Sequence, residues 1–393
     1  MSRILFLSRW FPYPPDNGSK IRIYNLLRGL AQEHEVTLLS FTDEPDVGPD
    51  VPALRALCRD VQVMPGKPFE PQSQRARLGF LSLTPRSVVD TFSPEMEHRI
   101  EQTLSTRDYD LVIASEFATA SYGRSLRGLP ALFEDPELGV LYEQFAHATS
   151  AWRRFRYGMT WVKQRHYLAR LLRYFRACTV VSERERRLLF LAVPNYQPIE
   201  VIPNCINLAD CDGVHEVAQV NTMIFTGSFR YFANHDAMTW FLREVYSRIQ
   251  AQVPDIHLTI TGDHANLPLP EAENVTLTGF VDDVRPLIAS CWISVVPIWR
   301  GGGTRLKILE AMALRTPVVS TSKGVEGLDA QHNDHLLIAD TPQAFTEAVI
   351  RLLKEPGLRQ RLADNAYQLV REKYDWAVVM PRFLNLVERV ARA

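Results

Sequence analysis

A glycine-rich turn followed at once by two cations and a carboxylate is the part of the sequence best suited to chemistry. The segment WRGGGTRLKILEAMALRTPVVST extends from Trp299 to Thr321. Consecutive glycines let backbone N–H groups converge on one point, and the start of a helix adds unpaired N–H groups and the positive end of its dipole. Arg305 adds a planar, forked charge and Lys307 a point charge. This combination is typical of a phosphate-binding turn.

Glu310 cannot bind phosphate, but it can complete a nucleotide site. It follows Lys307 by three residues and lies on the same face of the predicted helix. A carboxylate can accept hydrogen bonds from both the 2′ and 3′ hydroxyls of a ribose. The segment therefore predicts a nucleoside diphosphate ligand. A tight glycine turn before a solvated, charged helix is the alternative interpretation. The segment does not have the Walker order G-x-x-x-x-G-K-S/T.

The elements that position this segment follow from apolar runs that alternate with helix-period stretches. In the first half we predict strands at 4–8, 36–41, 61–64, 111–114, 131–133 and 178–181, and a helix over 21–32. In the second half we predict strands at 222–226, 257–261, 275–277, 293–297, 317–320 and 336–338, and helices over 237–251, 284–289, 305–313 and 342–354. This alternation indicates βαβ units and parallel sheets.

A polar, aperiodic stretch, DCDGVHEVAQVN, separates the two series and indicates a linker. We therefore predict an α/β fold of two doubly wound, Rossmann-like domains, 1–203 and 204–372. A C-terminal helix in 373–393 is expected to cross back to the first domain. Ligands of such sheets bind beyond the carboxyl ends of the strands, so a cleft between the domains is the expected site.

Composition narrows the class of protein. The chain has 393 residues, 46% hydrophobic and 23% charged, with a net charge of −1. This balance fits a globular protein of two domains and argues against a nucleic-acid partner bound through bulk basicity. The first eight residues are expected to form a buried strand, not a signal peptide. Five cysteines without C-x-x-C spacing favour a reducing cytoplasm and no metal site.

The segment from Gly301 to Thr321 also resembles a segment of a known protein family. GGGTRLKILEAMALRTPVVST is similar to the donor-binding segment of the family 4 retaining glycosyltransferases of GT-B fold, usually E-x-F-G-x-x-x-x-E-A-M-A-x-G-x-P-V-V. It is closest to the subgroup with a G-G-G-T-R-L-K run. IFTGSFRYFANHDAMTWF, VTLTGFVDDVRPLIASC, VVSERERRLL and VIPNCIN add to the similarity, as does the N-terminal SRWFPYPPDNGSKIRIYNLLRGL. The resemblance extends over nearly the whole chain and is stronger in the second half.

The resemblance implies a set of site residues. Glu310 matches the glutamate that holds the donor ribose, and Val281 lies where the backbone frames the base. Gly18 and Ser19 match the loop of the first domain that meets the diphosphate. The full donor-binding set is Gly18, Ser19, Gly227, Ser228, Arg230, Val281, Gly301, Gly302, Gly303, Thr304, Arg305, Leu306, Lys307 and Glu310. Catalytic roles are implied for Asp135, Arg230 and Lys307.

Three positions depart from the family pattern. Gly302 stands where the first glutamate of the motif would be. The lysine usually found shortly after the position of Arg230 is missing; Asn234 stands near it, and Lys307 is the candidate to supply the charge. The usual histidine of the first domain is missing from LFEDPELGV, where Asp135 or Glu137 is the candidate polar residue beside the acceptor.

The resemblance implies transfer of a sugar, with retention, from a nucleotide-sugar donor to a glycan or lipid-linked acceptor, in cell-surface polysaccharide assembly. Backbone amides and cations would stabilise the departing diphosphate without a metal or other cofactor. Asp282 and Asp283 are interpreted as a helix start and not as a D-x-D metal site. The alternatives are a catalytically silent donor-binding subunit and an epimerase or phosphorylase on the same scaffold.

A basic, aromatic stretch over 152–176 suggests a second kind of partner. No Asp or Glu occurs from Gln144 to Ser182, whereas the stretch includes Trp152, Arg153, Arg154, Phe155, Arg156, Tyr157, Trp161, Lys163, Arg165, Arg170, Arg173 and Arg176. One interpretation is a peripheral contact of a cytoplasmic protein with anionic lipid, where a lipid-linked acceptor is collected. The other is an ordinary long helix whose arginines are solvated or face the acceptor.

Overall fold

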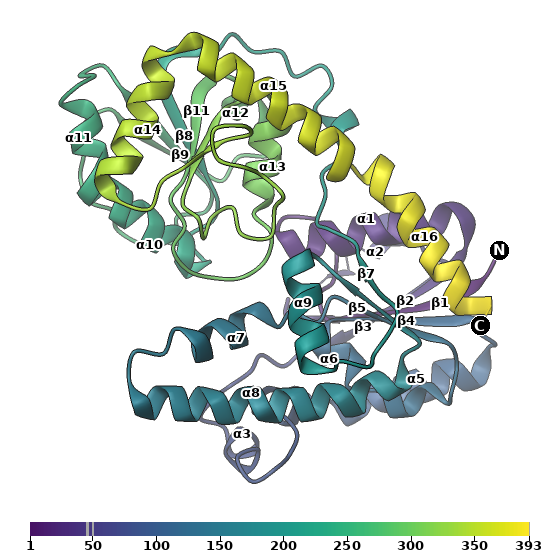
Figure 1. Cartoon of the computed structure of the whole chain (residues 1–393). Helices are drawn as coiled ribbons and strands as arrows, with labels where there is room; N and C mark the ends of the chain where they lie inside the picture. The colour runs from purple at the N-terminus through teal and green to yellow at the C-terminus, as the bar shows by residue number, and fades with distance from the viewer. Residues whose placement is uncertain (45–46, 49–50, 393) are drawn as a thin grey trace. The chain divides into compact units, whose positions relative to one another are not determined.

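The computed structural model describes residues 1–44, 47–48 and 51–392. Contacts divide the chain into two compact units (Figure 1). Unit 1 is Met1–Pro203 together with the chain from Met380 onward, and unit 2 is Asn204–Val379. Each unit is a parallel sheet covered by helices, which confirms the α/β, Rossmann-like class. Unit 2 ends later than the predicted boundary at 372.

The sheet of unit 1 has seven strands in the order β3-β2-β1-β4-β5-β6-β7. Every neighbouring pair is parallel. The strands are β1 (Arg3–Ser8), β2 (Glu35–Thr42), β3 (Asp60–Pro65), β4 (Leu111–Ser115), β5 (Ala131–Glu134), β6 (Ala177–Val180) and β7 (Ile199–Val201). The central strands are buried on both faces, as their continuous apolar runs predict.

The helices of unit 1 are more numerous than the sequence predicted. The predicted helix over 21–32 is α1 (Gly18–Glu33). The others are α2 (Val51–Arg55), α3 (Gln74–Leu78), α4 (Arg86–Thr91), α5 (Pro94–Thr106), α6 (Glu116–Ala120), α7 (Gly139–Ala146), α8 (Ala151–Leu171) and α9 (Glu183–Ala192), with 3₁₀ turns η2 (Gly123–Leu126) and η3 (Leu172–Tyr174). Side-chain caps fix several starts: Asn17 accepts from the Lys20 N–H, and Ser150 from that of Arg153.

Unit 2 contains a six-stranded parallel sheet in the order β10-β9-β8-β11-β12-β13. The strands are β8 (Gln219–Thr226), β9 (His257–Thr261), β10 (Val275–Gly279), β11 (Cys291–Val296), β12 (Val318–Ser320) and β13 (Leu337–Ile338). The helices and turns are η4 (Leu208–Asp210), α10 (Phe232–Phe241), the π-turn η5 (Leu242–Tyr246), α11 (Ser247–Gln250), α12 (Arg285–Ala289), α13 (Leu306–Ala313), α14 (Pro342–Lys354) and α15 (Pro356–Lys373). The helix predicted over 237–251 is therefore three successive segments.

The last helix, α16 (Trp376–Arg392), begins in unit 2 and ends in unit 1. Its first N–H, that of Trp376, donates to the Ile206 carbonyl at 3.0 Å. Farther along, Met380 lies over Gly29 of α1, where any Cβ would overlap its thioether. Arg389 then pairs with Glu200 beside β7 at 2.8 Å. The residues from Met380 onward are thus built into the first unit.

Among the described residues, no helix has the length and apolar character needed to cross a bilayer. Cys58, Cys178, Cys205, Cys211 and Cys291 are all free thiols.

A buried ion pair links the main layers of unit 1. Arg22 Nε, on α1, donates to Glu134 Oε1 at the end of β5 over 2.6 Å, and the side chains are 4% and 0% exposed. The second oxygen of Glu134 accepts from the Ser115 hydroxyl of β4 at 2.6 Å. Arg22 also donates to the Pro203 carbonyl at 3.2 Å. This network holds the carboxyl ends of two central strands against the first helix.

We predict that Arg22→Met destabilises the protein by about 3–5 kcal/mol, because it leaves the Glu134 carboxylate buried without its counter-ion. Urea unfolding followed by circular dichroism measures the change. The matched control is Arg186→Met, which removes an exposed pair with Glu183 and should cost at most about 1 kcal/mol. Equal shifts of the two unfolding midpoints would contradict the structural role of the buried pair.

Candidate functional site

The turn between β11 and α13 is shaped by its own arginine. Gly301 and Gly303 have φ values of 93° and 77°, a region that favours glycine. The buried Arg305 guanidinium folds back over the turn and donates to the carbonyls of Arg300, Gly301 and Gly302. In a trans peptide the C=O and N–H point in opposite directions. The N–H groups of residues 301–303 therefore face away from the guanidinium.

This geometry changes the role expected for the Arg305 side chain. The sequence suggested a charge beside a phosphate, but three carbonyl oxygens of the turn already engage this guanidinium. Arg305 instead fixes the turn whose N–H groups are available. A residue that the sequence analysis missed lies against the same turn: a side chain at position 301 would overlap the hydroxyl of Tyr231. Only the structure brings that tyrosine to the glycines.

The Lys307 ammonium group is enclosed by residues of other elements. Its Nζ donates to Asn234 Oδ1 of α10 at 2.9 Å and lies 4.0 Å from the centroid of the Phe225 ring of β8. Burial, together with the positive charge of Arg305 and against the opposing charge of Glu310, lowers the pKa of Lys307 to about 7. The structure thus places this lysine beside Asn234, where the resemblance led us to expect a cation.

The loop after β8 approaches Lys307 through glycine. A Cβ on Gly227, whose φ is 141°, would lie 2.6 Å from Lys307 Nζ. Asn234 closes the loop from the other side, because its Nδ2 donates to the Ser228 carbonyl at 2.7 Å. A Cβ on Gly262, after β9, would in turn lie 2.6 Å from the main-chain carbon of Gly227. Gly227, Ser228 and Lys307, all predicted from the sequence, therefore meet in one place.

Glu310 lies in the middle of α13 and keeps its carboxylate unengaged. Across the described part of the chain, no hydrogen bond or ion pair of this side chain occurs. Burial raises the pKa of the Glu310 carboxyl, against the opposing charges of Lys307 and Arg285. The side chain is half-buried, and a partly desolvated carboxylate without a partner is suited to accept hydrogen bonds from a ligand.

Arg230 and Val281 lie in the neighbouring loops of unit 2. Arg230 is well exposed and pairs with Asp263, which follows β9 and whose carbonyl accepts from the Phe229 N–H. The hydrogen bond to Asp263 and its negative charge raise the pKa of the guanidinium, and burial acts weakly in the opposite direction. Val281 is half-buried in the loop after β10. The Arg230 guanidinium is exposed and can turn toward an anion, whereas the Lys307 ammonium group is held by Asn234 and the Phe225 ring.

In unit 1, Gly18 and Ser19 form the exposed start of α1. The Asn17 side chain caps this start by accepting from the Lys20 N–H at 3.1 Å. Lys20 itself is drawn to carboxylates, with Glu44 at 2.8 Å and Asp16 at 3.3 Å. The backbone N–H groups of Gly18 and Ser19 are the donors that this loop offers.

Carboxyl groups gather where β4 and β5 of unit 1 end. Asp135 follows β5 with a φ of 56°, and its buried Oδ1 has no hydrogen-bond partner among the described residues. Burial raises the pKa of Asp135 well above its ordinary value; Arg22 opposes this, and Glu134, Glu137 and Glu116 add to it. The structure therefore supports Asp135 as a polar group available to a ligand.

Glu116 is a neighbour of this group that the sequence analysis missed. It follows β4 with a φ of 66° and accepts from Trp10 Nε1 at 2.9 Å. Burial raises the pKa of Glu116 to about 7, and the charge of Glu134 adds to that effect. The sequence contained a signal, because LVIASE and ALFED each end a predicted strand in a carboxylate. Carboxyl ends of neighbouring parallel strands meet at one edge, so the pair was predictable.

The two constellations differ in the chemistry that they allow. In unit 2, amide N–H groups and Lys307 suit an anion, and Glu310 suits a diol. In unit 1, burial raises the pKa values of Asp135 and Glu116, so these carboxyls can donate hydrogen bonds to uncharged hydroxyls when protonated and accept them when ionised. In the described ranges 1–44, 47–48 and 51–392, no cluster of three or more His, Cys, Asp or Glu side chains could hold a metal ion.

Comparisons with known proteins assign both units. The family model described as "Glycosyl transferase 4-like domain" matches residues 17–205, and that described as "Glycosyl transferases group 1" matches residues 220–355. A protein of the cps region of Klebsiella pneumoniae, uncharacterised and of 44.6 kDa, is 22% identical over 394 residues, which are 95% of this chain and 97% of its own.

Solved structures share the fold over almost the full chain. Sucrose-phosphate synthase from Thermosynechococcus elongatus superimposes with a TM-score of 0.70 at 18% identity, over 99% of both chains. Anabaena HepE in complex with UDP-glucose superimposes with a TM-score of 0.67 at 15% identity, over 99% of this chain and 100% of its own. With two Rossmann-like units and these matches, the fold and sites define a glycosyltransferase of the GT-B class. More particularly, the protein is a glycosyltransferase of the group 1 type.

We predict that Lys307 makes stability depend on pH. Its pKa is about 7 in the folded state against 10.5 for a free lysine, so between these values only the unfolded chain binds the proton. Stability should therefore rise as pH increases from about 7 to about 10. Lys307→Met should remove this rise. The stability of the variant relative to that of the wild type should therefore be highest at pH 6.

Thermal unfolding of the wild type and Lys307→Met from pH 6 to pH 10 checks this dependence. Lys354→Met, which removes an exposed lysine of α14, is the matched control and should follow the wild-type curve. If the stability of Lys307→Met depends on pH in the same way as that of the wild type, burial does not lower the pKa of Lys307.

Proposed function

We propose that the protein is a retaining glycosyltransferase of family 4, in the subgroup with the GGGTRLKILEAMA segment, that uses a nucleoside-diphosphate sugar. The observation that carries this proposal is the unengaged, half-buried carboxylate of Glu310, one turn beyond the Lys307 ammonium group that Asn234 holds. A ribose diol at Glu310 and a diphosphate at the start of α13 would satisfy both. The resemblance of the segment to the family's donor site supports the same assignment.

The catalytic contribution of unit 2 is stabilisation of the leaving diphosphate. The amides of residues 301–303 are held in place by Arg305 and need no reorganisation as charge develops. An anion beside Lys307 would raise its pKa, so a bound diphosphate would draw a full positive charge to itself at neutral pH. Arg230 would add an exposed charge. No metal or other cofactor is part of this proposal.

The acceptor is proposed to be a hydroxyl of a glycan or a lipid-linked saccharide, bound by the carboxyls of unit 1. Asp135 and Glu116 are suited to hydroxyl groups because neither is committed to a cation. Transfer with retention would proceed on the leaving-group face, with the diphosphate taking the acceptor proton. Assembly of a cell-surface polysaccharide on the cytoplasmic side is the proposed setting, in keeping with the relative from a cps region.

The donor is identified by screening UDP-, GDP- and ADP-sugars for thermal stabilisation, followed by NMR detection of sugar release. We expect the sugars of one nucleotide base to stabilise the protein. We also expect slow release of free sugar with the same anomeric configuration, α or β, that it has in the donor. Binding without any turnover, with or without acceptor glycans, would support a silent donor-binding subunit instead.

Glu310→Gln is expected to weaken binding of the matching nucleoside diphosphate by about 1.5–3 kcal/mol, because hydrogen bonds to a charged acceptor are lost. Isothermal titration calorimetry measures the affinity. Glu347→Gln on α14 changes the same group at a site remote from α13 and is the control. A 2′,3′-dideoxynucleoside diphosphate should bind both the wild type and Glu310→Gln equally. An unchanged affinity of Glu310→Gln for the ribonucleotide would remove Glu310 from the ribose role.

Glu116→Gln is expected to lower kcat/KM for the acceptor about 10–100-fold while donor affinity stays the same, because a hydrogen bond to a charged group in unit 1 is lost. The pKa of Glu116 is about 7, so its carboxylate forms as pH rises from 6 to 8. The wild-type rate should rise over this window and that of the variant should not. Identical pH profiles would show that Glu116 does not contact the acceptor.

A further inference from the structure

Helix α8 carries an apolar stripe on the side away from its own core. Trp161, Leu168 and Leu171 face inward and are buried. Trp152, Phe155, Met159 and Val162 follow one another at intervals of three or four, which aligns them on one helix face. These four side chains are 70%, 62%, 57% and 48% exposed. The Trp152 and Phe155 rings stack at 6.0 Å. We call these four residues the outer stripe.

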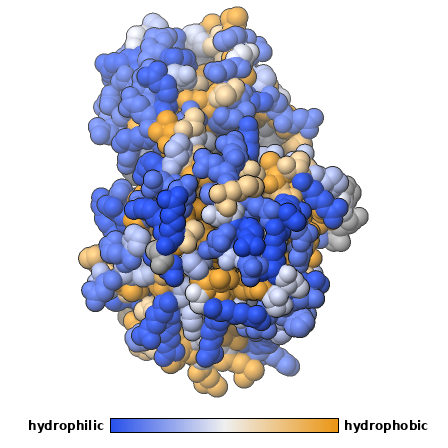
Figure 2. All heavy atoms as spheres, turned by 90° about the vertical axis from the view of Figure 1, so that its right-hand side faces the viewer, coloured by the Kyte–Doolittle hydropathy of each residue, from blue (hydrophilic) through white to orange (hydrophobic). Residues whose placement is uncertain are grey.

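A second apolar group lies beside the outer stripe. The loop between α3 and α4 exposes Leu78, Phe80, Leu81 and Leu83, and Leu81 is 90% exposed. Lys163 joins the two groups, because its Nζ donates to the carbonyls of Gly79 at 2.9 Å and Phe80 at 3.3 Å. Figure 1 draws α3 directly beneath α8, and Figure 2 shows apolar residues at the bottom of the molecule, at the height of α3 in Figure 1. We call residues 78–83 the apolar loop.

The apolar loop is held open by hydrogen bonds. Arg86 Nε donates to the Ala76 carbonyl at 2.8 Å, and its guanidinium lies 3.9 Å from the centroid of the Phe80 ring. The Gly79 N–H donates to the Arg75 carbonyl at 3.0 Å. A flexible loop would fold such side chains onto the protein surface. Here the backbone is tied down while the side chains stay in water, an arrangement that costs free energy unless an apolar surrounding covers them.

The charges around both groups have one sign. Residues 71–89 and 144–182 contain no Asp or Glu, but they contain Arg75, Arg77 and Arg86 in one range and a run of arginines in the other. Two acidic residues flank the first range: Glu70 is exposed, whereas Asp90 is buried and already accepts from Lys67, Ser73 and the Glu70 N–H. An apolar centre with a predominantly basic rim fits an anionic lipid surface.

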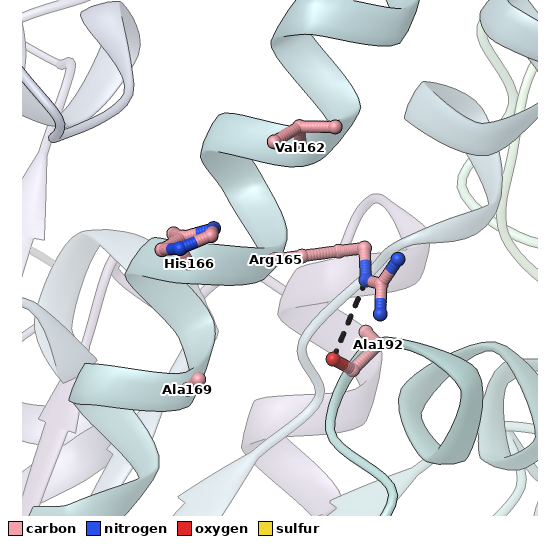
Figure 3. A pocket seen from close by; sticks show the side chains of 5 residues that line it. All are labelled: Val162, Arg165, His166, Ala169 and Ala192. Carbon is pink, nitrogen blue, oxygen red and sulfur yellow. Dashed lines mark hydrogen bonds between the residues drawn. The ribbon is translucent and has the colours of Figure 1, made fainter.

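A hollow lies at the C-terminal end of the outer stripe. It is lined by Val162, Arg165, His166, Ala169 and Ala192 (Figure 3). Arg165 reaches across it from α8, and its Nε donates to the Ala192 carbonyl at the end of α9 over 3.4 Å. A guanidinium thus stands beside the last apolar residue of the stripe. Cationic side chains therefore lie next to the apolar side chains along this face of α8.

We propose that the outer stripe and the apolar loop form one surface by which unit 1 inserts into the headgroup region of an anionic bilayer. The apolar loop enters most deeply, because its side chains are the most exposed and its backbone is fixed by Lys163 and Arg86. Aromatic side chains such as Trp152 lie at the boundary between headgroups and acyl chains. The apolar loop therefore acts together with the outer stripe of α8 and is the main anchor.

Flotation with vesicles tests this surface without donor or acceptor, so its result is independent of the proposed transfer reaction. The wild type should float with vesicles of phosphatidylcholine and phosphatidylglycerol and much less with pure phosphatidylcholine, and high salt should weaken the binding. Phe80→Ser/Leu81→Ser should reduce the partition coefficient about tenfold or more. Brominated acyl chains should quench the wild-type tryptophan fluorescence more than that of Trp152→Phe.

The matched control is Val217→Ser/Val220→Ser, which removes two exposed apolar side chains of unit 2 and should leave flotation unchanged. Circular dichroism and cooperative thermal unfolding of all variants show that they are folded. The proposal is overturned if the wild type stays in the aqueous fraction with anionic vesicles. It is equally overturned if the loop variant floats like the control, or if sedimentation shows that the loop mutation converts a dimer to a monomer.

Discussion

The confinement of one ammonium group sets the architecture of the donor side of the molecule. Lys307 Nζ is enclosed by the Asn234 amide, the Phe225 ring and the backbone at Gly227. A side chain at 227 would displace it, and one at Gly262 would push the 227 backbone onto it. Three loops that follow β8, β9 and β11 are therefore packed around a single ammonium group whose charged form is disfavoured by burial.

An unstable charge of this kind favours an anionic ligand without any induced movement. The turn at 301–303 is already fixed by Arg305, and Glu310 already faces an environment that disfavours its charge. Both unfavourable electrostatic terms would be relieved by the proposed ligand, which bears phosphate at one end and a diol at the other.

The sheets could be predicted from the sequence, because their strands are continuous apolar runs bounded by turn residues. The run predicted at 257–261 is β9 to the residue, and 293–297 differs from β11 by two residues at its start and one at its end. The short helices of unit 1 could not be predicted, because five-residue segments such as α3 and α6 are too short to show a helical periodicity of apolar residues. Glu310 and Lys307 were predictable from their spacing on α13. The Arg305 contacts, Tyr231 and the exposed apolar loop depend on how the backbone folds back, which no local pattern encodes.

The path of α16 has a consequence for how the molecule can be divided. Unit 1 is discontinuous in the sequence, since it takes its last helical turns from residues beyond Met380, while the start of the same helix bonds to Ile206 of unit 2. An N-terminal fragment that stops at Pro203 lacks the thioether over Gly29 and the partner of Glu200. Chimeras that exchange unit 1 between homologues must therefore transplant the tail together with the amino-terminal half.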